Sequence, residues 1–310
     1  MAAPRPKISG VFALTATYPH IRSHFRRSPD TVATPSEHTG GATFDAQMVP
    51  PSSPLTAPDP ISALVASMPP AYPQIFERRD IAEHAHIVYA RGKKRAHAAE
   101  WRQLPGGTVI ACVVAEDVPG LLSLVSAAFV AHHLDVTSAQ IFCRPVANGV
   151  EAVDFFWLKR ARPSRLPQHI GPEEIASVAN MLDELVGEEA QARKLAVKEL
   201  ERIAPELPVR PRVFYDTRAL RRGEVILNVV TPDRPGLLLA ITLSFVHQGL
   251  EVAASEVRTD QGVASDRFTL RDAKGGALSA NRLADIQRQV IAALKTEAAP
   301  GTAGHITPPE

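Results

Sequence analysis

Between about residues 77 and 294, the order of apolar and polar positions predicts short buried strands alternating with amphipathic helices. Continuous apolar runs at 109–115 and 225–230 are typical of strands that are buried on both faces. Apolar residues at helical spacing follow each run. The first set is Leu121, Leu122, Val125 and Phe129, and the second is Leu237, Leu238, Ile241 and Phe245. A strand followed by a helix is therefore predicted twice.

The same pattern predicts two more strands and a closing helix after each of these helices. The strands span about 136–144 and 150–159 in the first case, joined around Asn148-Gly149, a strong hairpin signal. In the second case they span about 251–259 and 263–271. Residues 212–215 are a candidate fourth strand for the first unit. The closing helices carry apolar faces made of Ile175, Val178, Leu182, Leu185 and Val186, and of Ile286, Val290 and Leu294.

An internal repeat underlies this symmetry. Residues 109–141 align without gaps on residues 225–257, and 13 of the 33 positions are identical. The chain therefore contains two copies of one module. The predicted order of elements is β-α-β-β-α-β, so the fold class is α+β with two ferredoxin-like modules packed together. Because helices cover only one face of such a sheet, we expect the two modules to cover each other's open faces.

Composition sets the expected boundaries. Of 27 prolines, 13 fall within the first 73 residues, and we read residues 1–65 as a disordered tail. Its arginines and lack of early acids leave open a targeting segment or a start codon read too early. We expect a helical linker at 66–104, with a helix from about 77 to 95. The first module then spans 105–216, the second 217–298, and a disordered tail 299–310.

Charge and cysteine content exclude several classes of protein. Lys and Arg total 34 against 33 for Asp and Glu, so the net charge of +1 makes nucleic acid an unlikely partner. No apolar run is long enough to span a bilayer, and we expect a cytoplasmic protein. Cys112 and Cys143 are expected to be reduced thiols. Glu83 and His86 share a predicted helix face without a third ligand, so we expect no metal and no cofactor.

A known family becomes recognisable at this point. Residues 229–238, Val-Val-Thr-Pro-Asp-Arg-Pro-Gly-Leu-Leu, resemble the opening of an ACT domain, a small-molecule-sensing regulatory module. Residues 210–217 and the basic linker after them resemble the junction between the tandem ACT domains of the bifunctional PII uridylyltransferase/uridylyl-removing enzymes. Residues 67–72, followed by a helix that contains histidines, resemble the approach to the first of those domains. The resemblance covers about residues 68–294 and implies amino-acid sensing in nitrogen regulation.

The catalytic motifs of that family are missing from this sequence. The family's nucleotidyltransferase domain needs paired metal-binding aspartates, whereas Gly40-Gly41 is followed only by the isolated Asp45. Its hydrolase domain holds a metal with His-Asp pairs, and no His-Asp dipeptide occurs here. We therefore expect a noncatalytic regulatory protein. The alternatives are a partial or divergent family protein whose catalytic domains are missing or encoded separately, and a pure assembly module.

The two Asp-x-Pro-Gly-Leu loops are the candidate ligand sites. Free N–H groups at the start of a helix favour a carboxylate, and an aspartate can accept from an ammonium group. We expect the second loop to hold the better site, because Arg234 can pair with a carboxylate and Val118 replaces it in the first loop. The resemblance makes glutamine the first candidate ligand, and we expect a homodimer or a regulatory partner protein. The candidate ligand-binding residues are Asp233, Arg234, Gly236, Leu237, Asp117, Val118, Gly120 and Leu121.

Overall fold

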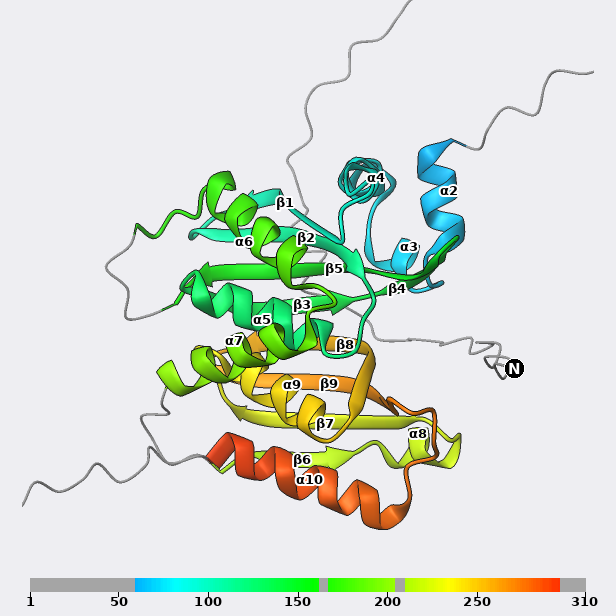
Figure 1. Cartoon of the computed structure of the whole chain (residues 1–310), viewed down its shortest axis with the longest axis vertical. Coiled ribbons are helices and arrows are strands. Elements are labelled where there is room, and N and C mark those ends of the chain that lie inside the picture. The colour runs from blue at the N-terminus through cyan, green and yellow to red at the C-terminus, as the bar shows by residue number, and fades with distance from the viewer. Residues whose placement is uncertain (1–58, 162–166, 204–209, 296–310) are drawn as a thin grey trace, which may run out of the picture.

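The strands that the structure describes in this 310-residue chain form one antiparallel sheet (Figure 1). The computed structural model describes residues 59–161, 167–203 and 210–295. Nine strands lie in the order β1-β2-β5-β3-β8-β9-β7-β6, with β4 pairing beside β5. Their bounds are β1 Ala96–Leu104, β2 Thr108–Glu116, β3 Leu134–Ile141, β4 Cys143–Val146, β5 Gly149–Arg160, β6 Arg212–Tyr215, β7 Val225–Pro232, β8 Leu250–Asp260 and β9 Val263–Asp272.

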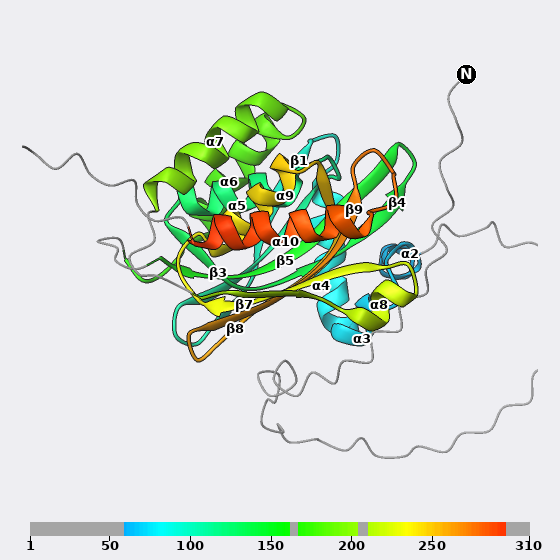
Figure 2. The ribbon, with the colours of Figure 1, turned by 90° about the horizontal axis from the view of Figure 1, so that it is seen from below.

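Helices cover the two faces of this sheet unequally (Figure 2). One face carries a helical layer over both halves, made of α5 (Leu121–Ala131), α6 (Pro172–Leu185), α7 (Glu189–Arg202), α9 (Leu237–His247) and α10 (Ala280–Lys295). The opposite face carries α2 (Pro60–Ser67), α3 (Tyr72–Ile75), α4 (Arg78–Ala90) and the short α8 (Thr217–Arg221). The main apolar core lies between the sheet and the first of these layers.

Most of the elements that the repeat predicts are present near their expected bounds. The hairpin at Asn148-Gly149 is confirmed, with Val146 paired to Gly149 across the turn. In the second copy Asp260 pairs with Val263. The helix expected to run to residue 95 ends at Ala90. Helix α7 was not predicted from the sequence. It packs against both α5 and α9, where Ala196 is buried among apolar residues of the two copies.

The order of strands in each copy differs from the prediction. The strand beside β2 is β1, which lies inside the expected helical linker 66–104, and Ala98 pairs with Val113. In the second copy β6 takes the same place beside β7, with Val213 paired to Val229. Residues 212–215 therefore belong to the second copy and not to the first. Each copy has the order β-β-α-β-β-α, because the strand expected at its end comes from the chain that precedes it.

The two copies join edge to edge, which corrects the expectation that their sheet faces cover each other. Strand β3 of the first copy pairs with β8 of the second, and Ala139 lies opposite Val257. The Ser138 hydroxyl also donates to the Val257 carbonyl at 2.9 Å. Helices α5, α7 and α9 pack together above this joint. A single sheet and a shared helical layer thus run through both copies.

Sequence differences between the copies explain why only one open sheet face is covered. In the first copy that face is apolar and lies under α2–α4. At the equivalent positions of the second copy it is largely polar and needs no such cover. The replacements from first to second copy, given by the repeat and by the strand registers, are Cys112 to Asn228, Phe142 to Arg258, Val153 to Ser265, Phe155 to Arg267 and Trp157 to Thr269.

Residues 59–65, which were expected to belong to a disordered tail, are folded. Helix α2 begins at Pro60, where proline is favoured, and the Asp59 carboxylate accepts from the backbone N–H groups of Ile61 and Ser62. Leu64 has no exposed surface and packs under the first copy's sheet. Residues 59–65 are thus part of the folded unit. The rest of the tail expected at 1–65, and the tail expected at 299–310, lie outside the described residues.

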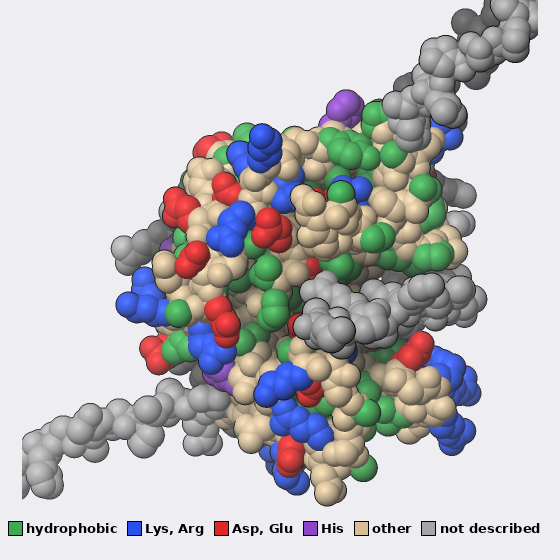
Figure 3. Space-filling model, turned by 45° about the vertical axis from the view of Figure 1, so that its right-hand side comes forward, with side chains coloured by type: hydrophobic (Ala, Val, Ile, Leu, Met, Phe, Trp, Pro, Cys, Tyr) green, Lys and Arg blue, Asp and Glu red, His purple; other side chains and the backbone are tan. Residues whose placement is uncertain are grey.

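Positive and negative side chains are mixed on the surface. On the face in Figure 3, Lys and Arg side chains lie among Asp and Glu side chains, in keeping with a net charge of +1 for the whole chain. Within residues 59–295, no helix that the structure describes is long and apolar enough to cross a membrane.

Candidate functional site

Each Asp-x-Pro-Gly-Leu loop turns sharply from a strand into a helix. Gly120 and Gly236 directly precede α5 and α9, with φ angles of 81° and 71°. That left-handed conformation is costly for residues with a Cβ, so glycine is required at both positions. The backbone N–H groups in the first turn of each helix have no partner within their own helix, and the helix dipole makes this end attractive to an anion.

The first pocket lies at the first loop and extends into the second copy. Its empty volume is about 580 Å³. The first copy contributes the loop, the start of α5 and the β4–β5 hairpin, and the second copy contributes α9, β8 and β9. Its polar and loop residues are Asp117, Val118, Gly120, Leu121, Ser123, Cys143, Asp154, Thr242, Glu251 and Arg271.

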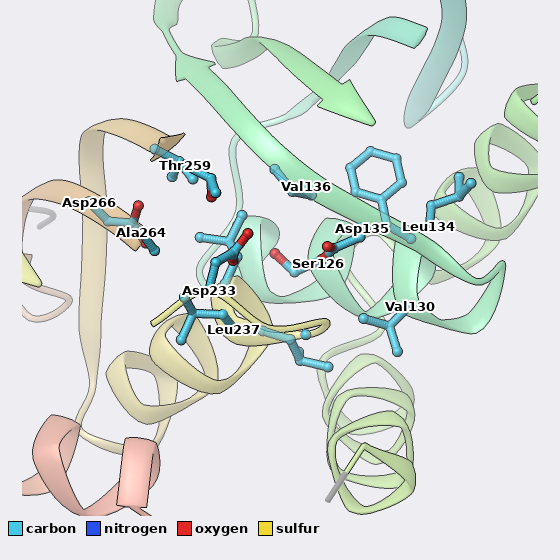
Figure 4. Close-up of a pocket in the computed structure, with 15 residues that line it drawn as sticks. Ser126, Val130, Leu134, Asp135, Val136, Asp233, Leu237, Thr259, Ala264 and Asp266 are labelled. Atoms are coloured by element: carbon cyan, nitrogen blue, oxygen red, sulfur yellow. The ribbon is translucent and has the colours of Figure 1, made fainter. Parts of the chain in front are cut away.

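The second pocket is built in the same way with the two copies exchanged (Figure 4). Its empty volume is about 370 Å³. Figure 4 shows Asp135 on a first-copy strand, facing the hollow that Asp233, Thr259 and Asp266 of the second copy also line. Its polar and loop residues are Ser126, Asp135, Asp233, Gly236, Leu237, Thr259 and Asp266.

Three acidic positions recur in the two pockets. Asp117 corresponds to Asp233 in the loops, and Glu251 corresponds to Asp135 on the strand from the other copy. The hairpin pairs Cys143 with Ala152 and Thr259 with Ala264, which makes Asp154 equivalent to Asp266. The two equivalent acids also make the same bond. Asp154 accepts from the Phe142 backbone N–H at 3.2 Å, and Asp266 accepts from the Arg258 backbone N–H at 3.3 Å.

The first pocket combines negative groups with a cation. Arg271 donates to Glu251 at 2.7 Å, and its Nη2 lies 3.9 Å from the Asp117 carboxylate. Burial raises the pKa of Asp117, and Arg271 opposes that shift. Burial also raises the pKa of Asp154 well above its usual range. The Ser123 hydroxyl, on a residue only 4% exposed, has no hydrogen-bond partner among the described residues.

The second pocket is dominated by acids. Burial raises the pKa of Asp135 to about 7, and the neighbouring Asp233 adds to that rise. Burial likewise raises the pKa of Asp266 to about 7, with a smaller rise from Asp233. The pKa of Asp233 itself is raised by burial and lowered by a hydrogen bond with Thr259. Among the residues that line this pocket, none is Lys or Arg. It is therefore suited to a cationic group and less suited to a carboxylate.

The structure brings together most of the residues chosen from the sequence. Asp117, Val118, Gly120 and Leu121 all line the first pocket. Asp233, Gly236 and Leu237 line the second. Arg234 does not line the second pocket, and its Nη1 has no hydrogen-bond partner in the part of the chain that the structure describes. Burial lowers its pKa.

Pocket residues outside the two loop motifs were missed by sequence reasoning. Arg271, Glu251 and Asp154 all line the first pocket, yet none lies in a loop motif. A signal was present in the repeat, because Asp135 and Lys159 are cross-strand partners in the first copy, as Glu251 and Arg271 are in the second. This signal points to the pockets only once it is known that the two copies join through β3 and β8.

The histidines singled out from the sequence do not form a site. His86 is exposed. His84 is fully buried, and its Nδ1 lies 2.7 Å from the Tyr72 hydroxyl. Burial lowers the pKa of His84 to about 3, so it stays neutral. Cys112 and Cys143 are free thiols, as expected. In residues 59–161, 167–203 and 210–295, no group of three or more His, Cys, Asp or Glu side chains could hold a metal ion.

Comparison with curated proteins points to one kind of enzyme. The relatives are bifunctional uridylyltransferase/uridylyl-removing enzymes. The protein from Phenylobacterium zucineum is 26% identical over 280 residues, which is 89% of this chain and 28% of the relative. That from Azospirillum brasilense is 26% identical over 73% of this chain and 24% of the relative. That from Burkholderia orbicola is 28% identical over 66% of this chain and 23% of the relative.

This chain is therefore homologous to those enzymes over most of its length. It spans about a quarter of the length of the curated relatives that it matches. No family model matches the chain. The homology agrees with the resemblance noted from the loop motifs, and because it covers only that quarter of the relatives it assigns none of their activities to this chain.

Proposed function

We propose that this chain is a regulatory protein whose two copies are ACT domains and which binds a small amino acid between them. The observation that carries the proposal is the construction of the two pockets. Each joins the Asp-x-Pro-Gly-Leu loop of one copy to a strand and a helix of the other. A ligand bound there contacts both copies, so its binding free energy depends on how the copies are joined.

The first pocket has the chemistry that a zwitterion requires. The start of α5 and the Arg271 guanidinium are donors for the ligand's carboxylate. The Asp117 and Glu251 carboxylates are acceptors for its ammonium group. The unpaired Ser123 hydroxyl is an additional polar partner in the same hollow. The second pocket offers acids without a lining cation, so we assign the tighter binding to the first pocket.

Arg234 was the reason to prefer the second loop on sequence grounds. Because Arg234 does not line the second pocket, the guanidinium in the proposed site is supplied by Arg271 of the other copy. The two assignments make opposite predictions. If Arg234 supplied the guanidinium for a site at the second loop, Arg234→Ala would weaken binding and Arg271→Ala would not.

The relatives support a biological setting for the proposal. They are uridylyltransferase/uridylyl-removing enzymes, and this chain covers about a quarter of their length. We infer that the chain acts in nitrogen regulation as a noncatalytic sensor, with glutamine as the first ligand to try. It would signal through a change in its own conformation, in a homodimer, or to a regulatory partner protein.

A thermal-shift screen of the twenty amino acids tests the proposal. A ligand present at 100 times its Kd stabilises the folded state by about 2.7 kcal/mol. We expect stabilisation by one amino acid or a small group of similar ones, and its loss in Asp117→Asn and Arg271→Ala. If no amino acid stabilises the chain, the loops serve only to start the helices and the assembly alternative is preferred.

The partial coverage of the relatives favours a second candidate, a piece of an enzyme that works with separately encoded catalytic domains. In this second candidate, the same two pockets would bind the ligand that regulates the enzyme. Co-purification with a nucleotidyltransferase or hydrolase subunit would support it. Recovery of the chain alone, still responsive to an amino acid, would favour the free-standing sensor.

A further inference from the structure

Strands β4 and β5 carry the first pocket on one face and the helices α2–α4 on the other. Because successive side chains of a strand point to opposite faces, neighbouring residues serve the two sides. Cys143, Ala152 and Asp154 line the pocket. Between and beside them, Arg144 and Glu151 lie on the side of the helices. The pocket and the helices α2–α4 thus lie on opposite faces of the same two strands.

Buried ionic contacts fix the helices to this hairpin. The Glu151 carboxylate, 3% exposed, accepts from Arg91 at the end of α4 at 2.6 Å and from Arg144 at 2.7 Å. Arg144 also donates to the Ser67 hydroxyl at the end of α2 at 3.1 Å. Charge-assisted bonds of this kind, shielded from water, are among the strongest in proteins. The position of α2 and α4 therefore depends on the β4–β5 hairpin.

A hydrogen bond of Asp154 links the pocket to an aromatic cluster at α3, formed by Tyr72, Phe76, Phe142 and Phe155. Asp154 is 1% exposed and lines the pocket, and its Oδ1 accepts from the backbone N–H of Phe142 at 3.2 Å. The Phe142 ring points the other way and packs edge-on against Tyr72, with ring centroids 5.5 Å apart. Asp154 is thus a pocket residue whose side chain is hydrogen-bonded to the backbone of Phe142, a residue that packs against α3.

We propose that α2–α4 is the element that responds to the first pocket, and that Asp154 is the positioning residue that couples the two. A ligand group that pairs with Asp154 competes with the Phe142 N–H for its oxygens and shifts the segment from Phe142 to Arg144. That segment holds both the aromatic cluster and the ionic contacts of the helices. What occupies the pocket rests on the proposed function, whereas the coupling rests on the bonds just described.

The second copy supplies a matched control. Asp266 occupies the equivalent place in the second pocket and accepts from the Arg258 backbone N–H at 3.3 Å. Arg258 replaces Phe142, and of the helices that the structure describes only the short α8 lies on that face of the second copy. Loss of Asp266 therefore removes the same kind of bond without reaching α2–α4.

Hydrogen exchange on the full chain tests the coupling without any ligand. In Asp154→Ala we expect the backbone amides of residues 60–90 to exchange roughly fivefold faster. That factor corresponds to the loss of one buried hydrogen bond that helps to hold α2–α4 in place. Asp154→Asn keeps an acceptor and should restore the wild-type rate. Asp266→Ala should leave residues 60–90 unchanged. An unchanged rate in Asp154→Ala, or an equal rise in Asp266→Ala, would overturn the proposal.

The reverse direction provides a milder test, because coupling between two sites is reciprocal. Ser67→Ala removes the bond to Arg144 on the helix side. We expect Cys143, which lines the pocket, to be alkylated by iodoacetamide several-fold faster in this variant. Ser177→Ala, which removes a hydroxyl bonded within α6, should not change that rate. Equal alkylation in wild type and Ser67→Ala would contradict the coupling even if Asp154→Ala does not fold.

L-Glutamine added to the wild-type chain separates this proposal from the proposed function. If glutamine binds and the exchange of residues 60–90 changes, both stand. If glutamine binds and the exchange of those amides does not change, the proposed coupling is wrong and the proposed function stands. If no amino acid binds, the proposed function fails, and the Asp154 and Ser67 variants still decide the coupling.

Discussion

Gly120 in the first loop lies directly against Val246 of helix α9 in the other copy. A Cβ added to Gly120 would stand 3.2 Å from the Val246 Cγ2 atom, closer than side chains normally pack. The loop that starts α5 is therefore also a contact between the two copies. Glycine is needed there for its left-handed backbone and for the space that it leaves.

Gly120→Ala should destabilise the chain more than a glycine substitution that changes the backbone alone. Gly223 provides the comparison. It has the same φ of 81°, and a Cβ added there would have no other atom within 4 Å. The backbone strain costs about 1–2 kcal/mol in either variant, and the crowding of Val246 adds about 1 kcal/mol in Gly120→Ala. Urea unfolding measures the two losses. Equal losses would show that the contact with Val246 has no energetic role.

The acids of the second pocket should make stability depend on pH. The folded chain holds a proton on Asp135 up to about pH 7, whereas an unfolded aspartate releases it near pH 4. Because the pKa is higher in the folded state, the protonated Asp135 adds to the free energy of unfolding. This contribution is fully present below pH 4 and is lost as the pH rises through 7. Asp135→Asn should therefore reduce the fall in stability between pH 4 and 7.

Chemical unfolding across that pH range measures the effect. Asp266 has the same raised pKa of about 7 and should give the same sign when changed to Asn. Asp260→Asn is the control, because Asp260 is exposed at the end of β8. A slope in Asp135→Asn that matches the wild type would mean that Asp135 ionises freely in the folded chain.

Helix α2 should contribute measurably to stability. Full burial of a leucine side chain such as Leu64 contributes about 1.5–3 kcal/mol, and α2 also provides Ser67 for Arg144. A chain that begins at Met68 should melt roughly 4 °C or more below one that begins at Asp59. Circular dichroism on the two chains checks this. Equal melting temperatures would place the folded boundary back near residue 68.

The repeat predicted most elements of the fold because thirteen identities fix where strands and helices begin. Strand β1 was missed because its short stretch of Ala96, Ala98 and Ala99 has weak β-propensity, and only pairing with β2 makes it a strand. The edge-to-edge joint was missed because both modules were assumed to leave similar open faces. Arg258, Ser265 and Arg267 already marked the second face as polar.

Only the loop residues of the candidate site were predicted from the sequence. Residues of the two loops are recognisable from their motif, since proline, glycine and aspartate each have a local role at a helix start. Most of the residues that complete each pocket come from the other copy, and their contribution depends on the pairing of β3 with β8. Arg271 is the clearest case, because its position in a strand gives no local sign of a ligand.

The purified chain should neither transfer uridylyl groups to a PII protein nor remove them. The reason is chemical, because the paired aspartates and the His-Asp pairs that such reactions need do not occur in this sequence. Labelled UTP and a PII protein, with a no-protein control, provide the assay. Transfer above that control by a preparation free of contaminating enzyme would show that the chain is catalytic.

Titration calorimetry on wild type, Asp117→Asn, Arg271→Ala and Arg234→Ala tests the central claim most directly. The titrant is the amino acid that stabilises the chain in the screen, with L-glutamine as the first choice. We predict binding to wild type and Arg234→Ala with similar Kd. Arg271→Ala and Asp117→Asn should each weaken it by about 1–3 kcal/mol, the range for a hydrogen bond to a charged group. Undiminished binding in both of these variants would contradict a ligand site between the two copies at the first loop.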